Sequence, residues 1–126
     1  MRVAIVEDDI NMRKSLEIAL SEYDGYEIVS FKNPVDALKK LDDTIDVIVT
    51  DINMPKMNGL DFIRELDGRD EVIVITGNAT LNKAVETLRL GVKDFITKPF
   101  EIDELVSAIN NASKIIEEEK KVEKRK

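Results

Sequence analysis

The chain has 126 residues, of which 43% are hydrophobic and 36% charged, a composition typical of one globular domain. It contains no cysteine and no histidine, which excludes disulfides, thiolate nucleophiles, histidine general bases and metal sites built from those residues. The 19 Lys+Arg and 26 Asp+Glu give a net charge of −7, which opposes direct binding to nucleic acid. No apolar run approaches the roughly 20 residues of a membrane helix, so we expect a cytoplasmic domain without a membrane segment.

Five short apolar segments alternate with longer segments of helical periodicity. The apolar segments are rich in β-branched residues, as in strands covered on both faces. They predict strands at Arg2–Val6, Glu27–Phe31, Asp46–Thr50, Val72–Ile75 and Asp94–Ile96. The periodic segments predict helices from Ile10 to about Tyr23, from Pro34 through Leu41, from Gly59 through Leu66, from Leu81 through Leu88 and from Ile102 through Ile116.

Turn and cap residues separate these elements. Asn33 and Pro34 stand in the order of an N-cap and a first helical residue, and Gly91 stands where a helix ends on a C′ glycine. The remaining expected breaks are Asp24-Gly25, Asp67-Gly68 and Gly77-Asn78.

Strict alternation of buried-type strands with helices predicts an α/β fold, with a parallel sheet and helices on both of its faces. In such doubly wound sheets, ligands bind beyond the carboxyl ends of the strands. The residues that follow the strands are therefore considered together. They are Glu7, Asp8 and Asp9 after the first strand, Asp51 to Pro55 after the third, Thr76 and Gly77 after the fourth, and Lys98-Pro99 after the fifth.

The carboxylates of this set favour a hard divalent cation. Two carboxylates about 5 Å apart repel each other by roughly 3 kcal/mol at an effective dielectric constant of about 20. Mg²⁺ relieves such repulsion with one or two carboxylates, several waters and phosphate oxygens as ligands. A phosphate group near Asp51 would also meet the Lys98 ammonium and the Thr76 hydroxyl, and aspartate is an accepted phosphoryl nucleophile.

Each of these residues also has an ordinary structural interpretation. Asp9 stands where it would cap the helix from Ile10, and a threonine after a strand is usually a turn residue. A lysine before a proline usually lies on the surface. Only the combination, with acids, hydroxyl and lysine after four strands that end at one edge, favours a functional site.

Four motifs in this order resemble the receiver domain of two-component response regulators, over about residues 1 to 120. They are I-V-E-D-D, V-I-V-T-D-I-N-M-P with Gly59, V-I-V-I-T-G-N-A and D-F-I-T-K-P-F. The resemblance implies the flavodoxin-like fold of CheY-like receivers, a five-stranded parallel sheet of order 2-1-3-4-5 with five helices. It also implies that Asp51 accepts a phosphoryl group from a phosphohistidine on a sensor kinase.

The resemblance further implies a Mg²⁺ site. Asp8, Asp51 and the backbone carbonyl of Asn53 would be ligands. Glu7 would act through a water, because the family's usual Asp-Asp pair is Glu-Asp in this sequence. Asp9 falls outside the pair, which returns it to the capping role.

Three further positions match the family's switch. Thr76 matches the switch hydroxyl and Lys98 the phosphate-contacting lysine, with the Lys98-Pro99 bond expected to be cis. Phe95 stands at the position of the rotameric aromatic, where many members have tyrosine. A new dianion would draw the Thr76 hydroxyl toward it and vacate space that Phe95 can enter. The alternative for Phe95 is an ordinary core aromatic.

Two other functions use the same kind of fold. A Mg²⁺-dependent phosphohydrolase with Asp51 as covalent nucleophile commonly needs an acid two residues later, where this chain has Asn53. A flavin- or nucleotide-binding module needs a Gly- or Ser/Thr-rich loop after the first strand, where this chain has E-D-D-I-N. Both are weaker hypotheses than a switch that catalyses only its own phosphorylation and dephosphorylation.

The output of the switch must lie elsewhere, because the sequence has no helix-turn-helix and no ATPase motif. The T-G-N-A-T segment is similar to receivers of activators of alternative-sigma-factor transcription, in which an ATPase domain follows. We therefore expect a receiver domain at 1–117 and a charged helical tail, or the start of a linker, at 118–126. The alternative is a solitary receiver that acts by docking on a partner or by phosphorelay. A phosphorylation-dependent homodimer through the last two helices is a further expected partner.

Overall fold

The computed structural model describes residues 1–52, 54, 56–66, 71–77 and 81–124, with the backbone alone described for 81–83 and 114–124. A single parallel sheet has the strand order β2-β1-β3-β4-β5, as predicted. Its strands are β1 (Arg2–Val6), β2 (Glu27–Phe31), β3 (Val47–Asp51), β4 (Glu71–Thr76) and β5 (Asp94–Thr97). The helices are α1 (Ile10–Ser21), α2 (Pro34–Lys40), α3 (Gly59–Leu66), α4 (Leu81–Arg89) and α5 (Ile102–Lys124).

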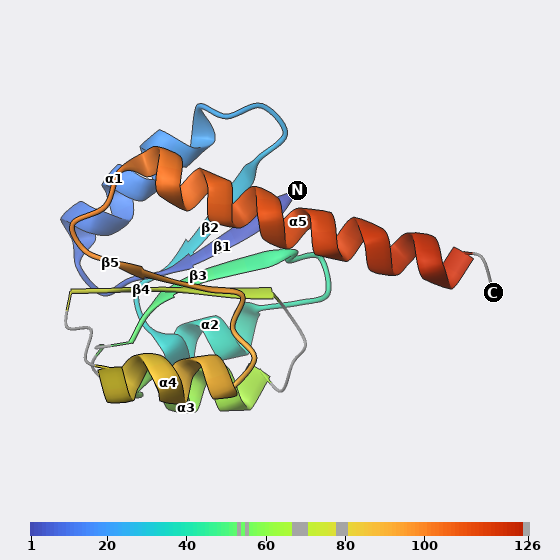
Figure 1. Cartoon of the computed structure of the whole chain (residues 1–126). Helices are drawn as coiled ribbons and strands as arrows, with labels where there is room; N and C mark the ends of the chain where they lie inside the picture. Colours follow the sequence, from blue (N-terminus) through green and yellow to red (C-terminus); the bar gives the residue numbers. More distant parts are fainter. Residues whose placement is uncertain (53, 55, 67–70, 78–80, 125–126) are drawn as a thin grey trace.

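Helices cover both faces of the sheet, with α1 and α5 on one face and α2, α3 and α4 on the other (Figure 1). Alternate strand residues supply the two cores, because successive side chains point to opposite faces. In β1, Val3 and Ile5 pack in the cluster under α1 and α5, whereas Ala4 and Val6 pack in the cluster under α2 and α3. The strands are therefore apolar on both faces, which is why their sequences are continuous rather than alternating.

The helix starts follow the predicted capping. The Asp9 carboxylate accepts hydrogen bonds from the backbone N–H groups of Asn11 and Met12, at 2.9 and 3.1 Å. The Asn33 side chain accepts one from the Asp36 N–H, and Pro34 is the first residue of α2. Each cap satisfies donors that have no partner inside the helix.

Some element boundaries differ from the predicted ones. α1 ends at Ser21 and not near Tyr23, whose N–H instead closes a turn on the Leu20 carbonyl. α2 ends at Lys40, because Leu41 has an extended backbone. β3 begins one residue late, since the Asp46 carboxylate accepts a hydrogen bond from the Arg2 N–H.

The predicted turns are confirmed where the structure describes them. Gly25 and Gly91 both have positive φ, +85° and +84°, where glycine carries no Cβ penalty. The predicted break at Asp67-Gly68 and residue Asn78 lie outside the described residues. α5 continues through the charged tail to Lys124 and projects past the sheet (Figure 1). Among the described residues, none of the helices has the length and apolar character needed to span a membrane.

Replacing Gly59 with alanine should destabilise the protein. A Cβ there would lie 2.5 Å from the Ile52 Cα and 2.7 Å from the Asp51 carbonyl oxygen, and backbone atoms of a central strand end have little room to yield. Overpacking of this kind costs about 1–3 kcal/mol, which urea denaturation would measure as a lower free energy of unfolding.

Gly77→Ala is the matched control. Its Cβ would meet nothing closer than Lys98 at 3.9 Å, so its free energy of unfolding should stay within about 0.5 kcal/mol of the parent. Equal loss in both variants would contradict a specific close approach at Gly59.

Candidate functional site

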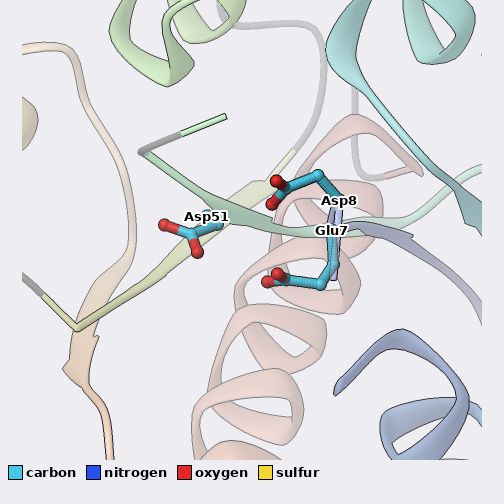
Figure 2. Close-up of side chains that lie close together, drawn as sticks. All are labelled: Glu7, Asp8 and Asp51. Carbon is cyan, nitrogen blue, oxygen red and sulfur yellow. The ribbon is translucent and has the colours of Figure 1, made fainter. Parts of the chain in front are cut away.

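Acidic side chains from two neighbouring strands meet at the carboxyl edge of the sheet. Val6 is paired with Thr50 in the parallel register of β1 and β3, so Glu7 and Asp51 follow at adjacent positions. One oxygen from each of Glu7, Asp8 and Asp51 lies within 4.8 Å of the others. Figure 2 shows the carboxylates of Glu7 and Asp8 on the side that faces Asp51. The structure thus gathers the predicted acidic cluster.

The three acids differ in burial. Glu7 is 1% and Asp51 6% exposed, whereas Asp8 is exposed to solvent. Burial is the largest influence on Glu7 and raises the pKa of its carboxyl group. The Lys98 ammonium opposes that effect and the negative charge of Asp51 reinforces it, so the pKa of Glu7 remains raised. The charged form of Glu7 is therefore held at an electrostatic cost.

Lys98 partly neutralises the cluster. Its Nζ lies 2.8 Å from Oδ2 of Asp51 and 3.3 Å from Oε2 of Glu7. Burial alone would lower the pKa of Lys98, but the hydrogen bond to Asp51 and the charges of both carboxylates outweigh it and raise the pKa. Lys98 also donates its backbone N–H to the Thr76 carbonyl, at 2.8 Å, and the Lys98-Pro99 peptide bond is cis, as expected.

The other predicted site residues lie around this cluster or outside the described part. Thr76 is fully buried and ends β4, where it is paired with Thr97 of β5, the residue before Lys98. Phe95 is half-buried and packs against the core cluster under α2 and α3. Asp9 caps α1 and is not part of the three-acid cluster. Asn53 lies outside the described residues.

Sequence reasoning missed how the Glu7 segment is held in place. Arg13 donates from Nη1 to the Glu7 carbonyl oxygen at 2.9 Å, and the Asp9 N–H lies 3.2 Å from Oε1 of Glu7. The Arg13 N–H also bonds to the Asp9 carbonyl. Every residue has a backbone carbonyl, so the sequence does not show which one accepts a hydrogen bond. The only available signal is that Arg13 lies one turn into the helix that follows Glu7.

The donor set fits a magnesium ion. All three groups are hard carboxylate oxygens, and Mg²⁺ prefers oxygen ligands and retains several waters. Asp8 is exposed, so an ion and its waters can reach the cluster from solvent. Glu7 and Asp51 repel each other, and a bound cation would relieve that repulsion. The cluster is typical of a receiver magnesium site.

The sheet order 2-1-3-4-5, with an acidic cluster at its carboxyl edge, defines the CheY-like receiver fold. The family model "Response regulator receiver domain" matches residues 3–110. The chain is 60% identical over 121 residues to the transcriptional regulatory protein FlgR of Helicobacter pylori, covering 96% of this chain and 32% of that protein. It is 35% identical to the chemotaxis protein CheY of Thermotoga maritima, covering 90% of this chain and 98% of that one.

A solved structure has the same fold over nearly the full length. The signal receiver domain of a putative LuxO repressor protein from Vibrio parahaemolyticus superposes with a TM-score of 0.87 at 27% identity, covering 97% of this chain and 96% of that one. The chain therefore belongs to the response regulator receiver domain family, a family of signalling domains and not of classical enzymes. It spans about a third of the length of FlgR.

Replacing Lys98 with methionine should destabilise the protein most when Mg²⁺ is absent. The variant removes the ammonium that pairs with the buried Glu7 and Asp51 carboxylates, while the methionine keeps most of the side-chain volume. We expect a loss of about 1–2 kcal/mol, less than for a fully buried ion pair because Lys98 is partly exposed. Urea denaturation with and without saturating Mg²⁺ would measure it, and Mg²⁺ should recover part of the loss.

Lys32→Met is the control, because its 4.0 Å ion pair with Asp36 is solvent-exposed on the lysine side. It should change the free energy of unfolding by less than about 0.5 kcal/mol in either condition. A Lys98 variant as stable as the parent without Mg²⁺ would contradict the role assigned to its charge.

Proposed function

We propose that this domain is a phosphorylation-activated signalling switch, in which Asp51 accepts a phosphoryl group from a phosphohistidine of a sensor kinase in the cytoplasm. The single observation that supports it best is the cluster at the carboxyl edge of the sheet. There the Asp51 carboxylate lies 2.8 Å from a lysine and within 4.8 Å of two further acids. Phosphoryl transfer needs positioning and charge neutralisation more than covalent chemistry from the protein.

The transfer forms one bond and breaks another. A carboxylate oxygen of Asp51 attacks phosphorus, the P–N bond to the donor imidazole breaks, and its electron pair returns to the imidazole nitrogen. The product is an acyl phosphate on Asp51. The Lys98 ammonium, now hydrogen-bonded to Oδ2, is close enough to follow the negative charge onto the phosphoryl oxygens. Mg²⁺ held by Asp8, Asp51, the Asn53 carbonyl and, through water, Glu7 would neutralise the same charge.

The new dianion would act on its neighbours in the sheet. Thr76 ends the strand beside Asp51, since Asp51 is paired with Ile75 in the register of β3 and β4. Its hydroxyl would turn toward the phosphoryl group, and Phe95 would move into the space that this leaves. Phe95 is only half-buried, so an inward movement of its ring would bury more of its surface. The change would alter the face formed by α4, β5 and α5.

The output of the switch is proposed from relatives. The identity of 60% to FlgR, named a transcriptional regulatory protein, favours a receiver that controls an attached output domain in transcription. The helical backbone of α5 through Lys124 suits a connection to such a domain. The alternative is a separate receiver that docks on a partner or relays phosphate, since the CheY relative is matched over 98% of its length. A reading frame that continues past Lys126 would favour the first.

Incubation with acetyl phosphate and Mg²⁺ should add one phosphoryl group to the protein, and Asp51→Asn should abolish the addition. An amide oxygen is too weak a nucleophile to form the acyl phosphate. Intact-mass spectrometry would measure the product, with Asp61→Asn, an exposed carboxylate on α3, as the control that still becomes labelled.

Persistent labelling of the Asp51 variant would contradict the assignment of Asp51 as the phosphoacceptor. Steady turnover of a phosphomonoester by the parent would instead favour the phosphohydrolase.

Thr76→Ala should become phosphorylated but fail to switch. Removing the hydroxyl leaves Asp51 intact while it breaks the link to Phe95. Beryllofluoride is a phosphoryl mimic, and adding it should change the backbone NMR chemical shifts of β5 and α4. In the variant these changes should be less than about a third of those in the parent, because the activated conformation loses the contact that stabilises it.

The exposed Thr97→Ala, one residue before Lys98 on β5, serves as the control and should keep the full response. A full response in the Thr76 variant would contradict the hydroxyl's role in coupling.

A further inference from the structure

A second concave site lies at the open edge of the sheet, and none of the three acids lines it. A pocket of about 380 Å³ is bounded by α1, by the end of the edge strand β2 and by α2. Its charged lining comes from both helices and the segment between β2 and α2. These residues are Arg13, Lys14, Glu17, Lys32, Asp36 and Lys40. The volume falls in the range of small-molecule sites, about 300–1,000 Å³.

The pocket has the opposite sign of charge to the molecule as a whole. Four cations and two carboxylates line it, giving a local charge of +2 in a chain whose net charge is −7. Both carboxylates have partners, since Asp36 lies 4.0 Å from Lys32 and Glu17 accepts a hydrogen bond from the Ser30 hydroxyl. Among residues 1–52, 54, 56–66, 71–77 and 84–113, no carboxylate lies within 4.0 Å of the ammonium of Lys14 or Lys40.

One of the cations is already held in position. Arg13 is half-buried, and its Nη1 donates to the Glu7 carbonyl at 2.9 Å. A guanidinium has five N–H donors, so this bond leaves others for a ligand. Fixing the side chain in advance lowers the entropy that binding would cost. Phe31 and Ser30 also line the pocket, and the Ser30 hydroxyl is already used as a donor to Glu17.

We propose that this pocket binds a small molecule that carries phosphate groups with at least two negative charges. A guanidinium with several ammonium groups around it is the donor set that phosphate oxygens prefer. The charge of the ligand would balance the local excess of +2. The site lies in a recess of small-molecule size, large enough for a phosphate compound such as a nucleotide. Binding here requires no phosphoryl group at Asp51.

The test uses two probes, inorganic pyrophosphate and ADP, added without Mg²⁺ at constant ionic strength. We expect saturable shifts of the backbone amide resonances of Ser30, Phe31 and Lys32 in ¹⁵N-labelled protein. The double variant Lys14→Gln/Lys40→Gln should raise the dissociation constant about tenfold, as two exposed charge contacts are lost. Tighter binding of ADP than of pyrophosphate would identify a nucleotide as the ligand class, and equal binding a phosphate-only ligand.

Lys39→Gln is the matched control, because Lys39 is an exposed lysine adjacent to Lys40 that does not line the pocket. It should leave both dissociation constants unchanged. Three results would overturn the proposal: shifts that do not saturate with either probe, equal weakening by the Lys39 variant, or shifts centred on Gly77 and Lys98. The last result would place the anion at the acidic edge instead.

Discussion

Repulsion among carboxylates at the end of the sheet is the interaction on which the site depends. Glu7 and Asp51 are both nearly buried, and the pKa of Glu7 is raised because burial and its acidic neighbour oppose its charge. Lys98, which directly follows β5, partly offsets that cost because its ammonium reaches both carboxylates. A charge cluster balanced in this way responds strongly to any added cation or anion, which is the physical requirement for a switch.

The fold itself imposes this crowding. The parallel register of β1 with β3 places the residues after Val6 and Thr50 side by side, and the register of β4 with β5 places Thr76 beside the residue that precedes Lys98. Gly59 lets α3 approach the end of β3 so closely that a Cβ would contact backbone atoms of Ile52. The strand register therefore brings together side chains that are distant in sequence. The core on both faces of the sheet keeps the strands in that register.

Much of this arrangement could be predicted from the sequence, because strand ends in a doubly wound sheet converge on one edge. Asp51, Thr76 and Lys98 each follow or end a clear apolar segment, so their convergence needed only the topology. The Arg13 hydrogen bond could not be predicted, since it ends on a backbone carbonyl. Nor could the late start of β3, because it depends on the Asp46 carboxylate bonding to Arg2, a partner 44 residues away. Local patterns specify elements, whereas such contacts depend on the packed chain.

Arg13 gives the molecule a link between two regions of opposite charge. Its guanidinium lines the basic pocket and is anchored on the carbonyl of Glu7, whose side chain belongs to the acidic cluster. An anion in the pocket would pull on this guanidinium, and a cation among the acids would pull on the Glu7 side chain, so both act on one residue. If occupancy of one site changed the affinity of the other through this residue, thermodynamic linkage would make the effect reciprocal. The short Asp9-capped connection from β1 to α1 therefore joins the Glu7 carboxylate of the acidic cluster to the Arg13 guanidinium of the basic pocket.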